Sequence, residues 1–275
     1  TRSSWVTGVQ TCALPIWVLF ATRPYELEAG AADSLAEHWN ERINRNISNG
    51  KISAFKRNLA EMVRDFDELP LKDIVKPKVG VVGEILVKYH PIANNDIVGI
   101  IEKEGGEAVV LDLIDFFLYG MYSKKFNYEY LAGTKKEMVL NALAIKVIEH
   151  YRRFARIPLE KSRRFHQPAF IEDTAKRAQE IISLGNQYGE GWLLTGEMME
   201  LIDEGVENVV CLQPFACLPN HITGKGMMKA VRKRNPYANI AAIDYDPGAS
   251  NVNQLNRIKL MMATAYKNLK SRNKA

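Results

Sequence analysis

The sequence predicts an α/β fold: a Rossmann-like parallel sheet flanked by helices, with a helical segment before it. Four short apolar runs, at residues 79–82, 108–112, 208–212 and 240–244, have the length and composition of buried strands. Amphipathic stretches separate these runs along the chain. This alternation of strand and helix favours parallel strands joined by right-handed crossovers.

The first sixteen residues stand apart from the rest. Residues 6–16, VTGVQTCALPI, resemble the translation of a sequencing-library adapter at all eleven positions. We therefore expect residues 1–16 to be artefactual and Cys12 to be no ligand. This interpretation also removes the apparent secretory signal formed by Arg2 and the apolar run 12–21. It leads us to expect a native chain that continues upstream of Trp17.

Residues 17–75 predict a helical segment, the remnant of a truncated upstream domain. Ser34 and Glu37 fit a capping box. Two apolar stripes at helical spacing follow, formed by Leu35, Trp39, Ile43 and Ile47 and then by Phe55, Leu59, Met62 and Phe66. A proline-bounded linker at 70–77 separates them from residues 76–275, which form the predicted α/β domain.

Residues 83–95, after the first predicted strand, form a predicted loop with His90 and Asn94. Ligands of parallel sheets bind at the carboxyl ends of strands, so these two side chains are candidates for substrate contact. The alternative for His90 is a surface or packing role. Gly80 and Gly83 do not complete the G-x-G-x-x-G fingerprint of dinucleotide sites.

Three further features have a structural and a functional interpretation. The apolar stripe at 140–154 predicts a core-facing helix rather than a cofactor site. The glycine-rich loop 185–191 predicts a turn, because it lacks the Lys and Ser or Thr of a P-loop. Asp244, Asp246 and Ser250 could ligate a hard cation, but turn and N-cap chemistry is the favoured interpretation.

The composition, 47% hydrophobic and 25% charged with a net charge of +5, is that of an ordinary soluble globular protein. Clusters of basic residues are interpreted as solvated helix faces, since no nucleic-acid motif accompanies them. No apolar stretch reaches the roughly 18 residues of a membrane span. With Cys12 set aside, two cysteines in a chain of this length argue against a disulfide scaffold and for a reducing cytoplasm.

The most informative stretch is the loop after the third predicted strand, which holds Cys211 and Cys217. Pro214 and Pro219 stiffen its backbone. Asn220 and His221 follow, ahead of a predicted helix at 224–234. From the residues alone three interpretations stay open: a metal site, a structural thiol pair and a redox disulfide. Asn220 and His221 either lie beside the ligand or cap the helix and pack.

Several separated motifs, at residues 22–26, 189–192, 211–226, 242–250 and 253–257, resemble acyl-CoA dehydratase activase-related proteins, relatives of the 2-hydroxyacyl-CoA dehydratases. The resemblance implies a 4Fe-4S cluster held by Cys211 and Cys217. It implies an ATPase activator as partner and an acyl-CoA as substrate. It also implies that Glu190 and Trp192 lie near the site. A third cysteine ligand is expected upstream or from a partner.

These observations lead to three hypotheses. The first is the iron–sulfur component of an ATP-dependent dehydratase or reductase system. The second is a non-catalytic iron–sulfur scaffold or electron relay. The third is a structural α/β domain with buried thiols. Bound iron separates the first two from the third, and substrate turnover separates the first from the second.

Overall fold

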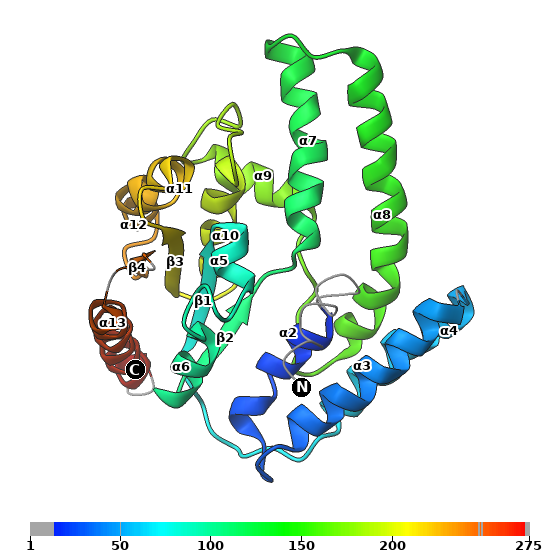
Figure 1. The fold of residues 1–275 in the computed structure, drawn as a ribbon, viewed down its shortest axis with the longest axis vertical. Coiled ribbons are helices and arrows are strands. Elements are labelled where there is room, and N and C mark those ends of the chain that lie inside the picture. Colours follow the sequence, from blue (N-terminus) through cyan, green and yellow to red (C-terminus); the bar gives the residue numbers. More distant parts are fainter. Residues whose placement is uncertain (1–13, 50, 247, 249, 273–275) are drawn as a thin grey trace.

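The computed structural model describes residues 14–49, 51–246, 248 and 250–272 (Figure 1). Its centre is a four-stranded sheet in the order β2-β1-β3-β4, with every neighbouring pair parallel. The strands are β1 (Lys78–Gly83), β2 (Glu107–Val110), β3 (Asn208–Pro214) and β4 (Asn239–Tyr245). The predicted α/β fold is confirmed.

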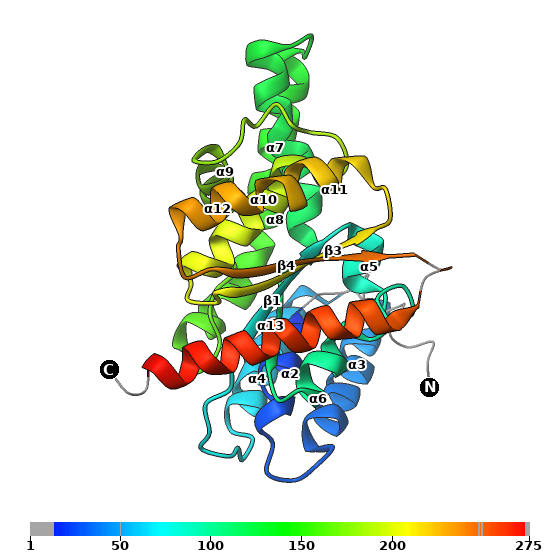
Figure 2. The ribbon, with the colours of Figure 1, turned by 90° about the vertical axis from the view of Figure 1, so that its left-hand side faces the viewer.

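Helices cover both faces of the sheet (Figure 2). One face carries α9 (Ile171–Gln179), α10 (Gly191–Asp203), α11 (Leu218–Thr223) and α12 (Met228–Arg234). The other face carries α6 (Ile97–Lys103) and α13 (Asn251–Arg272). The strands are apolar on both sides because each face packs into its own hydrophobic cluster.

The N-terminal part is helical, as expected, with α2 (Leu14–Phe20), η1 (Arg23–Tyr25), α3 (Ala31–Asn49) and α4 (Ile52–Asp67). Trp39, Met62 and Phe66 are the centre of its core. Residues 1–13, most of the adapter-like segment, lie outside the described residues. Arg23 bonds to Glu102 at 2.9 Å and to Asp33 at 3.0 Å, so this residue ties η1 to α6 and α3.

A long hairpin of α7 (Ile114–Tyr130) and α8 (Lys135–Lys161) projects from the sheet domain (Figure 1). Thr134 and Glu137 form a capping box at the start of α8. The predicted core stripe of α8 is wrong at four of its positions: Leu140, Leu143, Val147 and Tyr151 are all exposed. Spacing predicts an apolar face, but it cannot say what covers that face.

Three local predictions also need correction. Helix α3 begins at Ala31, so Ser34 and Glu37 lie inside it and do not form the predicted capping box. The predicted loop at 83–95 contains a short helix, α5 (Ile85–Tyr89), because Glu84 accepts a hydrogen bond from the Val87 amide and starts it. The helix predicted at 224–234 begins earlier, as α11. It is then divided by η2 (Lys225–Met227).

None of the described helices combines the length and the apolar character needed to cross a membrane.

Candidate functional site

The candidate site lies at the carboxyl edge of the sheet between β1 and β3. After β1, the chain forms β2 on one side of β1, and it then crosses over to form β3 on the other side. The order of the strands therefore reverses between β1 and β3, which makes this edge a topological switch point. The two backbones are very close, because a Cβ on Gly83 would lie 2.1 Å from the Leu212 carbonyl oxygen. Only glycine fits there, so the close approach of β1 and β3 at this edge depends on Gly83.

The glycine-rich loop 185–191 forms one border of this edge. Gly189, with a φ of +59°, packs against Pro219 at the start of α11. The Glu190 carboxylate accepts a hydrogen bond from the Ile85 amide at 3.0 Å and is buried. Glu190 therefore links this loop to α5, on the segment that follows β1.

Cys217 is half-buried on the segment that follows β3 and is the residue before α11. The Asn220 side-chain amide donates to the Cys217 sulfur at 3.2 Å. Asn220 is fully buried, and its Oδ1 has no hydrogen-bond partner among the described residues. The structure thus places Asn220 against the thiol rather than at a helix cap.

Ala216, directly before Cys217, has a left-handed φ of +62°. This conformation costs a residue with a Cβ about 1–2 kcal/mol, part of which glycine recovers at the expense of chain entropy. We expect Ala216→Gly to raise the free energy of unfolding by about 0.5–1 kcal/mol, measured by urea denaturation. A destabilised variant would mean that the loop does not hold this conformation.

A polar group surrounds Asp244 at the end of β4, next to β3. The Gln213 side-chain amide donates to Asp244 Oδ1 at 2.5 Å, and Lys225 Nζ lies 3.2 Å from Oδ2. His221 Nε2 is 3.7 Å from Asp244 Oδ1 and 3.5 Å from Gln213 Nε2. Partial burial acts to raise the pKa of Asp244, but the hydrogen bonds from Gln213 and Lys225 and the nearby positive charge hold it below its usual value.

Gln213 and Lys225 were not predicted from the sequence, and Asp244 was predicted as a turn residue. Gln213 and Asp244 are register partners in parallel strands, and each follows an apolar run. Both residues could have been identified from the sequence, because each is a polar residue at the carboxyl end of an apolar strand. In contrast, Asp246 accepts from the Gly248 amide and Ser250 from the Val252 amide, which is the predicted turn and cap chemistry.

Cys211 lies in a different environment from Cys217. It is fully buried in the core between the sheet and α10, and a Cβ on Gly224 would lie 2.8 Å from its sulfur. Burial, followed by the charges of Glu197 and Asp244, raises the pKa of the Cys211 thiol to about 12. Both cysteines are free thiols, so the redox-disulfide interpretation has no bond here to support it.

The two candidates after β1 differ in availability. The Asn94 amide donates to the Val87 carbonyl at 2.7 Å, and its oxygen accepts from the Ile97 amide at 3.1 Å. Asn94 is buried and joins α5 to α6, so its polar atoms are already used. His90 is partly exposed at the end of α5.

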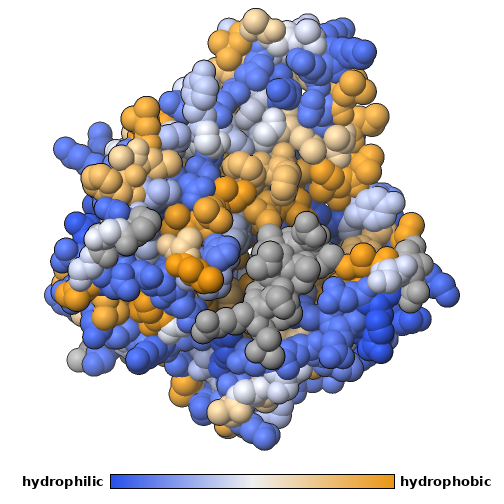
Figure 3. Space-filling view, in the orientation of Figure 1, coloured by the Kyte–Doolittle hydropathy of each residue, from blue (hydrophilic) through white to orange (hydrophobic). Residues whose placement is uncertain are grey.

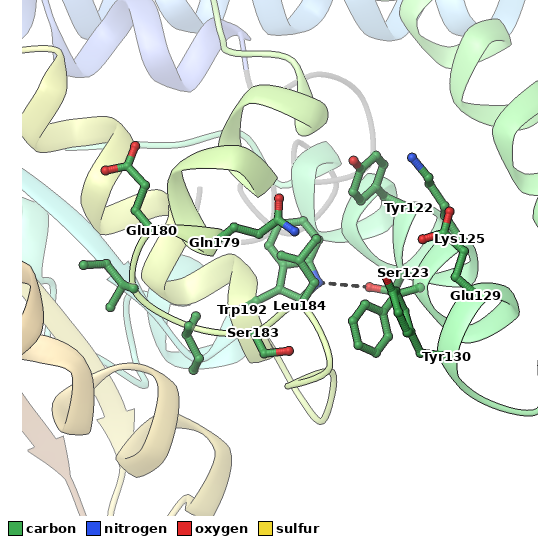
Figure 4. A pocket seen from close by; sticks show the side chains of 13 residues that line it. Tyr122, Ser123, Lys125, Glu129, Tyr130, Gln179, Glu180, Ser183, Leu184 and Trp192 are labelled. Carbon is green, nitrogen blue, oxygen red and sulfur yellow. Dashed lines mark hydrogen bonds between the residues drawn. The ribbon is translucent and has the colours of Figure 1, made fainter.

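A pocket of about 440 Å³ lies elsewhere, between α7 and the segment 179–184 (Figure 4). The Trp192 indole is one of its lining side chains and donates to the Ser123 hydroxyl at 3.2 Å. Trp192 is therefore a packing residue of α10 and α7, fully buried. The pocket contains neither cysteine and none of the polar group around Asp244.

Of the two described cysteines, only Cys217 is placed where its sulfur could ligate an iron–sulfur cluster. Cys217 is partly exposed, whereas the fully buried Cys211 would have to leave the core to ligate a metal. Within the described ranges no three His, Cys, Asp or Glu side chains are grouped to hold a metal ion. A cluster at this edge would therefore need thiolates from outside these residues.

Comparisons with protein-family models, curated proteins and solved structures found no match. The resemblance to acyl-CoA dehydratase activase-related proteins therefore remains a prediction.

Proposed function

We propose that this chain is the 4Fe-4S component of an ATP-dependent 2-hydroxyacyl-CoA dehydratase or reductase system in the cytoplasm, with Cys217 as its accessible thiolate. The observation that carries the proposal is Cys217, a partly exposed free thiol on the segment after β3 at the switch point of a parallel sheet, with the Asn220 amide donating to its sulfur. The motif resemblance supplies the identity of the system, its ATPase activator and its acyl-CoA substrate.

The residues around Cys217 have roles that suit such a group. The Asn220 amide donates to the sulfur, and donors of this kind tune the potential of a thiolate-bound cluster. The partly exposed His221 imidazole, beside Asp244 and Gln213, is positioned to hold or move a proton at this edge. Cys217 would hold the cluster, which would supply one-electron transfer at this edge of the sheet.

A second function rests on Cys211. Its complete burial favours the structural hypothesis for at least this thiol, in which the sulfur fills the core as a small apolar group. If Cys217 also binds no metal, the chain is a structural α/β domain. If it binds a cluster without turnover, the chain is a scaffold or an electron relay.

The test is iron and acid-labile sulfide in protein purified without oxygen from the full natural gene. We expect Cys217→Ala to lose most of both, because it removes the accessible thiolate. Cys211→Ala is the matched control and should retain at least half, since its thiol is enclosed by the core. Equal iron in the native protein and Cys217→Ala would sink the proposal.

A further inference from the structure

Helix α8 is apolar on two sides, and only one of them is covered. Ile145 is buried in the cluster that also contains Leu118 of α7. A second row, here called the α8 stripe, faces solvent. It consists of Val139, Leu140, Leu143, Val147 and Tyr151, which are 51%, 55%, 58%, 53% and 43% exposed. An apolar row on a surface helix normally packs against a neighbour, and this stripe has none within the described chain.

The shape of the stripe suits a helix. Leu140, Leu143, Val147 and Tyr151 follow one another at the spacing of a single ridge, and the 13 residues from Val139 to Tyr151 span about 18 Å. Apolar side chains gather over α7 and α8 on the face seen in Figure 3. A row one residue wide and about three turns long matches the seam between two packed helices.

The charges beside the stripe are basic. Lys135, Lys136, Lys146 and Arg153 are exposed on α8. The two acidic residues nearest the stripe are engaged: Glu137 belongs to the capping box, and Glu149 bonds to Arg152 and Arg156. Glu160 is exposed but lies nine residues beyond the end of the stripe. A second copy would bring like charges together, whereas an acidic helix would be attracted.

We propose that the α8 stripe binds an amphipathic helix of a partner protein, with large apolar residues at i, i+3, i+7 and i+11 and acidic residues on both sides. This is packing of one helix against another, in which apolar anchors provide affinity and flanking charges provide selectivity. The inference is independent of Cys217 and of the proposed function.

The probe is a helix-stapled peptide of about 18 residues, with leucines at that spacing and glutamates beside them. We expect saturable binding by fluorescence anisotropy. The Leu143→Asp/Val147→Asp variant should weaken it about a hundredfold, at about tenfold for each lost anchor. Leu260→Asp is the matched control, because Leu260 is exposed on α13, and it should bind normally. Circular dichroism checks that each variant is folded.

Charge reversal tests the flanks. Lys146→Glu/Arg153→Glu should weaken the glutamate peptide about tenfold and strengthen a lysine-flanked peptide with the same leucines. Four results would overturn the proposal. In the first two, the native protein binds neither peptide, or it binds both peptides equally. In the third, it dimerises through the stripe, as seen by sedimentation. In the fourth, it binds phosphatidylcholine–phosphatidylserine vesicles instead, and this binding is lost in the stripe variant.

Discussion

Replacing Lys88 with methionine is expected to lower the free energy of unfolding by about 3–5 kcal/mol. Lys88 Nζ lies 2.8 Å from Glu197 Oε1, and the two side chains are only 3% and 6% exposed. The pair joins α5, at the candidate site, to the middle of α10. Methionine keeps much of the side-chain volume but leaves the Glu197 carboxylate buried without its cation.

The loss should depend on pH. Burial raises the pKa of Glu197, against the attraction of Lys88. A carboxyl group with a raised folded-state pKa favours folding while it is protonated, and that contribution is lost as pH rises through the folded-state value. Removing Lys88 raises this pKa further. The variant should therefore lose less free energy of unfolding at about pH 5 than at about pH 8, as measured by urea denaturation at both pH values.

Two controls distinguish the effect of an unpaired buried carboxylate on stability from the effect of replacing any lysine. Lys233→Met, on the exposed side of α12, should change stability by less than about 0.5 kcal/mol. Lys88→Met combined with Glu197→Leu should recover most of the loss, because it removes the uncompensated carboxylate. A single variant as stable as the native protein at pH 8 would show that the pair is not enclosed.

The sheet could be predicted because buried parallel strands are apolar on both faces, so 208–212 and 240–244 stand out without any partner information. The loop of Cys217 could be predicted for the same reason, since it follows such a strand. Interactions between distant segments could not. Gln213 is hydrogen-bonded to Asp244, 31 positions away in the sequence, and Lys88 to Glu197, 109 positions away.

Burial was also only partly predictable. The spacing at 140–154 indicates a helix, and α8 is one, but the same pattern fits a core face and an interface. Cys211 and Cys217 look equivalent as neighbouring thiols in the sequence. The structure separates them, because Cys211 is within β3 and points into the core while Cys217 lies beyond the strand end.

The two thiols should differ at least a hundredfold in their rate of alkylation in the folded protein. The thiolate is the reactive form, and reagents must also reach it. With its pKa raised to about 12, the enclosed Cys211 is a thiolate at pH 8 in only about one molecule in 10⁴. Cys217 is partly exposed and lies outside the core, so reagents reach it more readily.

Pulse labelling with iodoacetamide, followed by peptide mass spectrometry, measures the alkylation rate of each cysteine separately. The signal of Cys12 is therefore not confused with those of Cys211 and Cys217. We expect Cys217 to label at once and Cys211 only as urea unfolds the protein, because its exposure needs the core to open. Rapid labelling of both in native buffer would make Cys211 available as a second cluster ligand. Protection of both would favour buried structural thiols and remove the accessible thiolate on which the proposed function rests.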